Sequence, residues 1–323
     1  MLKFLLRRLF QASIVMFVIS LIAFAIQDNL GDPTRELVGL SVAMEDREAL
    51  KTQFGLNDPF LVQYMRFITG ALQGDFGTSY FFKKPALDVI LEKLPATLEL
   101  VISSTLLITI LSVPLVIYNA LNPKKILTKI IMSVSIIGLS VPVFLTAILL
   151  IYTFSVTLGW LPSFGRGEVV HLFGSWYTNF LSVDGLLHII MPTLALSSIM
   201  LPLFIRLIRA EMLEVLSSEY VRFATAKGLN KKTIYYKHAL KNTMLPVVTV
   251  GGLQIGTMVA YTILTETVFQ WPGMGFMFLE AIKRSDIPLI TTYLIIVGLI
   301  FVITNTLVDL LYGWINPTVN LTG

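Results

Sequence analysis

The chain has 323 residues, of which 55% are hydrophobic and only 14% are charged. Soluble domains carry about 25% charged residues, so this composition excludes an ordinary soluble enzyme or binding module. The net charge is only +4 and reflects how basic residues are distributed between segments, not a nucleic-acid-binding patch. No cysteine is present, which excludes disulfides and thiolate metal sites.

Six long uncharged runs alternate with charged segments. They contain 19, 24, 36, 21, 24 and 22 residues, and about 20 apolar residues span a bilayer core as a helix. The sequence therefore predicts an all-α polytopic membrane protein with six transmembrane helices. The runs are 9–27, 100–123, 130–165, 185–205, 242–265 and 287–308.

The first run resembles a secretory signal peptide. Three basic residues within the first eight precede it, and a small-residue pattern ends at Ala25. The apolar stretch continues past Ala25 to full span length, so we expect it to remain as the first transmembrane helix.

The segment 28–96 is too long for a plain loop. Asn57 and Asp58 precede Pro59, a pattern typical of a helix start with proline at its first position. We expect an amphipathic helix there, covered by the membrane surface, by the chain's own spans or by a partner. Its apolar residues follow at helical spacing: Phe60, Tyr64, Phe67, Ile68 and Leu72.

The run 130–165 is long enough for one helix with an interfacial tail or for two spans. Pro142 lies inside it, and Gly159, Trp160 and Pro162 close it with residues typical of helix breaks and membrane interfaces. We predict one helix at 130–157, because two spans would return the chain to the side from which it came.

Lys and Arg gather on alternate segments. The amino tail, 119–129 and 206–242 carry 14 basic and 3 acidic residues. The segments 28–96, 158–184 and 268–287 carry 10 basic and 14 acidic residues. Because cytoplasmic loops are rich in Lys and Arg, we expect both termini to be cytoplasmic. We therefore divide the chain into three predicted parts. Residues 1–29 form the cytoplasmic tail and the first transmembrane helix, residues 30–96 form an extracytoplasmic segment, and residues 97–323 form a five-helix permease core.

The segment 206–242 is a basic, amphipathic insert between two membrane-length runs. Gly228 follows Lys227 and suits a left-handed helix end, and Asn230 can cap a second helix that begins at Lys231. We predict two helices, broken at Gly228, that dock a partner protein on the cytoplasmic face.

Two acids lie near predicted membrane boundaries, Glu99 at the start of the second span and Glu266 near the end of the fifth. Because charge at membrane depth is costly, each either snorkels, pairs with an arginine, or lines the outer mouth of a pore. Trp271 lies in the sequence WPGMG and is either an interfacial anchor or part of a gate. Glu99, Glu266 and Trp271 are the residues that we predict at the pore or its outer mouth.

Motifs for enzymatic chemistry are missing. Asp75-Phe76-Gly77 lacks the other kinase loops, and no GxxxxGK[ST] phosphate loop occurs. The three histidines have no metal-ligand spacing. We therefore expect no catalytic residue, metal or cofactor in this chain, and any use of ATP must come from another polypeptide.

Many ordered segments along nearly the whole length carry a family resemblance: MLKFLLRRLF, FGLNDPFLVQY, GDFGTSY, PATLEL, SVPVFLTAILL, LGWLPSFGRG, HIIMPTLALS, EYVRFATAKGLNKKTIYYKHALKNTMLPVVT, ETVFQWPGMGF and LVDLLYGWINP. Together they resemble the permease subunits of ATP-binding-cassette (ABC) importers for dipeptides, oligopeptides and nickel. The nearest branch is the first permease subunit of dipeptide importers.

The resemblance implies a type I ABC importer permease fold in the bacterial cytoplasmic (inner) membrane. It also implies a homologous second permease, one or two cytoplasmic ATPases that bind ATP and Mg, and an extracytoplasmic solute-binding protein. The chain would form half of the translocation pore, and a coupling helix would sit in a groove of the ATPase. By resemblance, that coupling element contains Tyr220, Arg222, Ala224, Ala226, Lys227, Gly228 and Leu229.

Alternatives remain at this point. An ion-coupled secondary transporter or channel would need broken helices with buried mid-membrane charges in repeated halves, and an intramembrane enzyme would need a catalytic constellation. Within the importer class, peptides are the expected solute, while nickel, glutathione, haem and peptide toxins stay open because the binding protein largely selects the solute.

Overall fold

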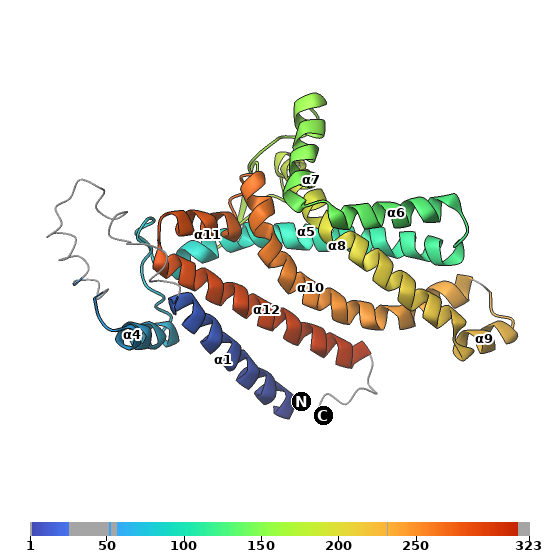
Figure 1. The fold of residues 1–323 in the computed structure, drawn as a ribbon, viewed down its shortest axis with the longest axis horizontal. Coiled ribbons are helices and arrows are strands. Elements are labelled where there is room, and N and C mark those ends of the chain that lie inside the picture. The colour runs from blue at the N-terminus through green and yellow to red at the C-terminus, as the bar shows by residue number, and fades with distance from the viewer. Residues whose placement is uncertain (1, 26–51, 53–56, 231, 316–323) are drawn as a thin grey trace.

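The computed structural model describes residues 2–25, 52, 57–230 and 232–315. Within this part the chain is built almost entirely from helices (Figure 1). Three features of the sequence analysis lie outside the described residues: the first part of the extracytoplasmic segment (26–51 and 53–56), the helix start at Lys231, and the tail 316–323.

The described elements follow in chain order. They are α1 (Leu2–Ala25), α4 (Phe60–Leu72), α5 (Ala86–Leu121), α6 (Ile126–Ser140), α7 (Val143–Leu150), η2 (Ile151–Thr157), β1 (Val170–Phe173), β2 (Trp176–Thr178), α8 (Val183–Ser217), α9 (Glu219–Ala226), η3 (Thr233–Ala239), α10 (Leu240–Val268), α11 (Met274–Lys283) and α12 (Ile287–Ile315).

Five of the described helices are long and apolar enough to cross a membrane, and a bent pair is a sixth candidate span. The five spans are Leu6–Ala25, Ala86–Leu121, Val183–Ser217, Pro246–Val268 and Ile287–Leu311. α9 lies at one end of the bundle, here called the α9 end, and α4 and α11 lie at the opposite end, here called the α11 end (Figure 1).

The expected continuous helix at 130–157 is wrong, because the chain breaks before Pro142. α6 ends at Ser140, Val141 is extended with φ −91° and ψ 121°, and α7 begins at Val143. Proline lacks an N–H and disfavours helical geometry in the residue before it. The two parts, Ile126–Gly138 and Val143–Thr157, are bent by 110°, and the second ends as the π-helix η2.

The bent pair links two separate parts of α5. α6 starts beside the carboxyl end of α5, where Lys125 N–H donates to Asn122 O. The chain after η2 returns to the opposite part of α5, where Arg166 pairs with Glu99. By length and composition the pair is one candidate span, which makes up to six among the described helices.

The core has two main apolar clusters joined along α5 and α8. The cluster toward the α11 end contains Ile90, Leu100, Leu196, Met258 and Trp271, and the cluster toward the α9 end contains Val116, Ile208, Met212 and Val247. Small polar residues also join α5 to α8. Ser104 Oγ of α5 donates to Thr193 O of α8, and Ser197 Oγ of α8 donates to Ser104 O, both at 3.4 Å. Small polar residues of this kind let membrane helices approach closely.

Glycines bring α10 and α12 into close contact. A Cβ at Gly252 would overlap the side chain of Val308, and one at Gly256 would overlap the ring of Phe301. Such small residues are typical of tightly packed transmembrane helix pairs.

The amphipathic helix α4 packs on α1, which identifies the cover for its apolar stripe. Tyr64 is buried, its hydroxyl lies 2.9 Å from Ser20 Oγ, and its ring contacts Phe24. Pro59 precedes the first helical residue instead of occupying it, and no side chain caps this end.

A small antiparallel hairpin, β1–β2, was not predicted. It pairs Val170 with Thr178 and His171 with Tyr177. Its strands are only four and three residues long, too short to show a periodic pattern in the sequence.

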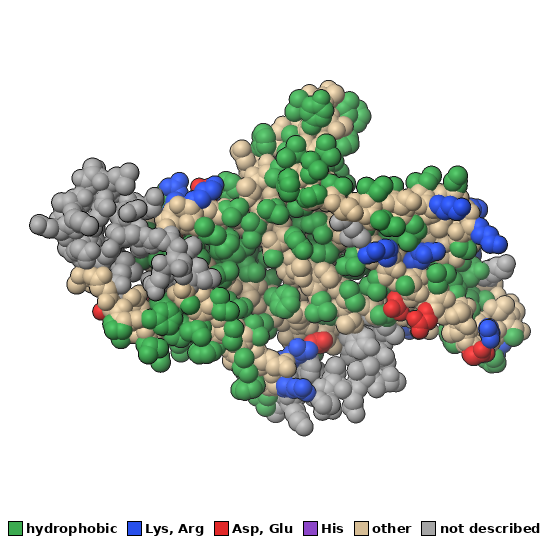
Figure 2. Space-filling view, in the orientation of Figure 1, with side chains coloured by type: hydrophobic (Ala, Val, Ile, Leu, Met, Phe, Trp, Pro, Cys, Tyr) green, Lys and Arg blue, Asp and Glu red, His purple; other side chains and the backbone are tan. Residues whose placement is uncertain are grey.

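Hydrophobic side chains cover most of the middle of the face drawn in Figure 2, and Lys, Arg, Asp and Glu gather toward its ends and lower edge. This distribution is typical of a surface that contacts lipid.

Candidate functional site

The predicted docking segment folds at the α9 end as a short helix held on one side and open on the other. Val221 and Ala224 of α9 pack against Ile234 of η3, and all three are buried. The opposite face of α9 is exposed, including Tyr220 and Phe223, which are 47% and 60% exposed. α9 therefore presents a fixed, partly aromatic surface beyond the bundle.

The turn after α9 follows the prediction for Gly228. Its φ is +77°, its N–H donates to Thr225 O, and Leu229 N–H donates to Ala224 O. This pair of hydrogen bonds is the Schellman arrangement that ends helices at a left-handed glycine. Asn230 also caps as expected, since its Oδ1 accepts from Lys232 N–H at 3.1 Å.

One boundary of the docking segment differs from the prediction. The part of the segment before Gly228, expected as one helix, is interrupted at Ser218, where ψ is 152° and α8 gives way to α9. The interruption makes α9 a separate element, so its orientation is set by its contacts with α8 and η3.

Six of the seven predicted coupling residues are exposed, and Ala224 is turned inward against Ile234. The exposed ones are Tyr220, Arg222, Ala226, Lys227, Gly228 and Leu229. Their role in contacting an ATPase stays a prediction.

Local contacts organise the exposed face of α9. Arg222 forms an ion pair with Glu219 at 2.7 Å, and Lys227 Nζ lies 4.6 Å from the centre of the Phe223 ring. The Tyr220 hydroxyl and His238 Nδ1 are 2.5 Å apart. Phe223 is the residue that the sequence analysis left out, although its position on the polar side of an amphipathic helix was a usable signal.

At the α11 end, Glu266 joins three helices. Thr97 Oγ1 of α5 donates to Glu266 Oε1 at 2.6 Å, and Phe276 N–H of α11 donates to Glu266 Oε2 at 2.9 Å. Thr97 Oγ1 in turn accepts from Met274 N–H at 2.8 Å. A carboxylate at the first turn of a helix also interacts favourably with the helix dipole, so Glu266 fixes the start of α11 against α5 and α10.

Trp271 is fully buried next to this group. Its Nε1–H donates to Ala96 O at 2.9 Å, and the preceding Gln270 has a left-handed φ of +48°. Gly275 lies so close to α10 that a Cβ there would be 2.7 Å from Ile263 Cα. The WPGMG turn is thus packed between helices of its own chain.

Glu99 forms the second buried acidic group. Arg166 donates to Glu99 Oε2 from Nη2 and Nε at 2.7 and 2.9 Å, and Asn179 N–H donates to Oε1 at 3.2 Å. Arg166 Nη2 also donates to Tyr177 O at 2.6 Å. Pairing with an arginine was one of the alternatives for Glu99, and the pair holds the β1–β2 hairpin on α5.

Glu99, Glu266 and Trp271 are all buried and bonded within this chain. They connect the segments at the α11 end to the transmembrane helices. Their placement at the mouth of a pore stays a prediction.

Asp286 is a third buried carboxylate, and sequence reasoning missed it. Its Oδ2 accepts from Ser79 Oγ at 2.5 Å and from Phe81 N–H at 3.1 Å. Burial, and then the Asp286 charge, raise the pKa of the nearby Tyr80 to about 12. The partners are more than 200 positions apart in the chain, so no local pattern could reveal them.

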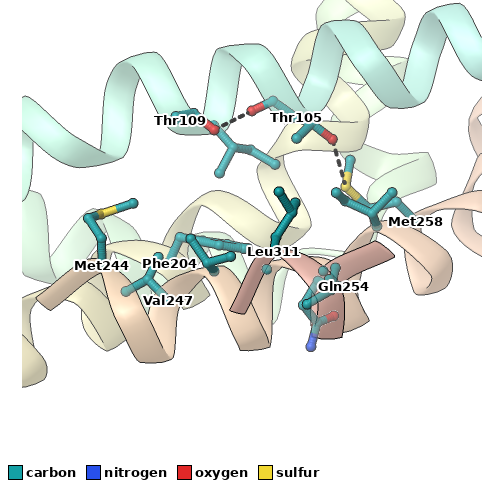
Figure 3. A pocket seen from close by; sticks show the side chains of 14 residues that line it. Thr105, Thr109, Phe204, Met244, Val247, Gln254, Met258 and Leu311 are labelled. Carbon is teal, nitrogen blue, oxygen red and sulfur yellow. Dashed lines mark hydrogen bonds between the residues drawn. The ribbon is translucent and has the colours of Figure 1, made fainter. Parts of the chain in front are cut away.

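A pocket of about 260 Å³ lies between α5, α8, α10 and α12 (Figure 3). Thr105 and Thr109 of α5 lie on one side, and Met258 and Gln254 of α10 lie on another. Thr105 Oγ1 contacts Met258 S at 3.9 Å. The lining is mostly apolar, with a few hydroxyl and amide groups.

Comparison with known proteins gives the family. Residues 110–321 match the model of the binding-protein-dependent transport system inner membrane component, and residues 1–101 match the model of its membrane component N-terminal region. The chain is 35% identical over 331 residues to the dipeptide transport system permease protein DppB of Alkalihalophilus pseudofirmus, with 99% of each chain covered.

Two further relatives are similar over 99% of both chains. The oligopeptide transport system permease protein AppB of Bacillus subtilis is 33% identical over 321 residues, and the glutathione transport system permease protein GsiC of Escherichia coli is 34% identical over 320 residues.

A solved structure shares the fold. It is the MetNI methionine ABC transporter in an inward-facing conformation, with a TM-score of 0.55 and 14% identity over 71% of this chain and 97% of that chain. The long apolar helices and the full-length similarity agree. The chain belongs to the binding-protein-dependent transport system inner membrane components, the membrane-spanning permease subunits of ABC importers.

Proposed function

We propose that this chain forms half of the translocation pore of an ATP-driven importer for dipeptides or oligopeptides. Full-length similarity to permeases named for dipeptide and oligopeptide transport supports the solute class. The exposed face of α9, held from behind by Val221 and Ala224, is the structural observation that carries the coupling role.

In this proposal α9 and the turn at Gly228 dock in a groove of a cytoplasmic ATPase. ATP and Mg bind to that partner, and closure of an ATPase pair moves α9 and opens the pore outward. The α9 end and both termini are then cytoplasmic, and a solute-binding protein delivers its cargo at the α11 end. A homologous second permease completes the pore.

The pocket between α5, α8, α10 and α12 offers few polar groups to a solute. The polar groups in its lining are the uncharged side chains of Thr105, Thr109 and Gln254, and the rest of the lining is apolar. Selection of the solute is then left to the binding protein.

Affinity purification of the tagged chain in mild detergent, followed by mass spectrometry and proteoliposome uptake, tests the proposal. We expect a second permease and ATPases with phosphate loops to co-purify, and dipeptide uptake to require both ATP and the binding protein. Competition by dipeptides, longer peptides and glutathione then ranks the solutes. A chain that purifies alone and moves solute without ATP overturns the proposal in favour of a secondary transporter.

A further inference from the structure

α1 covers only one side of the apolar surface of α4. The rings of Phe60, Tyr64 and Phe67 each lie 5.7 Å from the ring of Phe24 on α1, measured between ring centres. Tyr64 is buried by this contact. The three aromatic residues therefore define the side of α4 that faces α1.

A second apolar stripe on α4 is exposed, and it consists of Leu61, Met65, Ile68 and Leu72. Its first three members each follow directly after one of the three aromatic residues, so the second stripe lies about 100° around the helix from the side that faces α1. Leu61, Met65 and Leu72 are 68%, 62% and 84% exposed. A contiguous apolar stripe of this kind marks a surface that contacts something other than water.

The polar side chains of α4 lie on a third side. Arg66 forms an ion pair with Asp58 at 2.5 Å, and Gln63 Nε2 donates to Asp58 O at 2.7 Å. Gln73, directly after the helix, lies on this side and is exposed. The border between this side and the second stripe is occupied by Val62 and Thr69.

α4 crosses α1 where the apolar span ends. The Tyr64 hydroxyl lies 2.9 Å from Ser20 Oγ, and Ser20 and Phe24 belong to the last two turns of α1. The first charged residue after the uncharged run is Asp28. The level of α4 along α1 is therefore the boundary between the hydrocarbon core and the headgroups.

At this level α1 itself has an exposed apolar side. One side packs on α12, since a Cβ at Gly298 would lie 2.5 Å from Ile19 Cδ1. On the side away from both α12 and α4, Val18, Leu21 and Ile22 are 45%, 37% and 54% exposed. Exposed aliphatic side chains on a membrane-length helix are typical of contact with lipid, so lipid reaches α1 beside α4.

We propose that α4 lies in the membrane interface at the carboxyl end of α1, with the second stripe inserted among the upper acyl chains. A helix that packs sideways on a span and rests on the bilayer meets these two neighbours roughly at a right angle around its axis, which is the offset between its two apolar sides. The ion pair of Arg66 with Asp58 then faces water.

A lipid surface fits this stripe because all four of its side chains are apolar and unbranched or branched aliphatic groups without a hydrogen-bonding atom. α4 carries a single charged residue, Arg66, so the contact rests on apolar burial and not on the charge of the headgroups. The assignment goes beyond the proposed transport function and does not depend on it.

Spin labels on single introduced cysteines test the assignment, because the chain contains no cysteine of its own. The full-length chain is measured in lipid nanodiscs with its partner subunits present. Met65→Cys and Leu72→Cys place labels on the second stripe, and the adjacent Arg66→Cys and Gln73→Cys are their matched controls on the polar side. Dissolved oxygen, which partitions into lipid, and a nickel chelate, which stays in water, are compared as relaxing agents.

The two stripe labels should have an oxygen-to-nickel collision ratio severalfold higher than their neighbours, equally in zwitterionic and anionic lipids. Equal ratios at Met65→Cys and Arg66→Cys, and at Leu72→Cys and Gln73→Cys, would place the stripe in water and overturn the proposal. Stripe labels that neither reagent reaches would assign the stripe to a protein partner and overturn it as well. The second pair keeps the test valid if Met65→Cys or Arg66→Cys does not fold.

Discussion

Glu266 accepts hydrogen bonds through both of its carboxylate oxygens, one from Thr97 and one from the main chain of α11. An amide in its place offers only one acceptor oxygen and turns an NH₂ group toward a donor. The position therefore depends on the carboxylate and not only on the volume of the side chain.

Glu266→Gln should lower the free energy of unfolding by about 1–3 kcal/mol, because one buried donor loses its acceptor. Thermal unfolding in detergent measures the effect. Glu280→Gln is the matched control, since Glu280 is paired with Lys283 at the surface and such pairs contribute about 0–1 kcal/mol. Uptake assays on the same variant test the pore-mouth prediction, which fails if uptake is unchanged.

The buried Tyr80 side chain makes the free energy of unfolding depend on pH in the alkaline range. Its pKa is about 12 in the folded chain and about 10 in unfolded peptides, so between these values the unfolded state ionises first. The stabilisation from the buried neutral phenol is complete below pH 10 and is lost as the pH rises toward 12. Tyr80→Phe should unfold with a weaker dependence on pH in this range. Identical pH profiles for the two proteins would show that Tyr80 titrates normally.

At the level of elements, the turn after α9 depends on one backbone conformation. Gly228 has φ +77°, which costs other L-residues roughly 1–2 kcal/mol and β-branched residues more. Gly228→Val should abolish uptake and leave membrane insertion intact. Gly228→Asn should retain most uptake, because asparagine tolerates the left-handed region. Transport-coupled ATP hydrolysis that persists in Gly228→Val would refute the docking role.

The positive charge of Lys227 on α9 should strengthen binding to the ATPase mainly at low ionic strength. Lys227→Glu reverses an exposed charge on the docking face, and exposed charges are screened as ionic strength rises. We expect reduced co-purification of the ATPase at low salt, with a smaller reduction at high salt. Lys124→Glu, in the exposed turn between α5 and α6, is the control and should have no effect. Equal recovery of the ATPase with both variants would contradict an electrostatic contribution.

The sequence predicted elements whose signals are local and left out those that depend on distant contacts. The uncharged runs placed the spans, and Gly228 and Asn230 placed the turn and cap of the docking segment. Pro142 was visible, but its effect depends on whether neighbouring helices restore a continuous span, and here the chain bends by 110°. The pairing of Glu99 with Arg166 and of Asp286 with Ser79 spans 67 and 207 positions, so only the fold reveals it.

For the whole molecule, the path of the bent pair α6–α7 determines on which side of the membrane each later connecting segment lies. If the pair crosses the membrane, the β1–β2 hairpin and the α5–α6 turn lie on opposite sides. If it re-enters, they lie on the same side. The contacts of the hairpin with Glu99 support the first arrangement.

Single cysteines test this directly, because the chain contains none of its own. A membrane-impermeant maleimide should label Ser175→Cys, in the hairpin, from outside intact cells. It should label Lys124→Cys and Ser217→Cys only after the cells are opened. Labelling of Ser175→Cys and Lys124→Cys under the same condition would show that α6–α7 does not cross.

The pairing of α1 with α12 has a consequence for biosynthesis. Among the described spans α1 leaves the ribosome first and α12 last, and about 260 residues separate the two helices. At roughly 5–20 residues per second, synthesis of the intervening chain takes on the order of 15–50 s. During that time α1 has α4 as a neighbour but not the helix against which it finally packs. Its retention in the bilayer until α12 has been inserted must therefore rest on its own hydrophobicity.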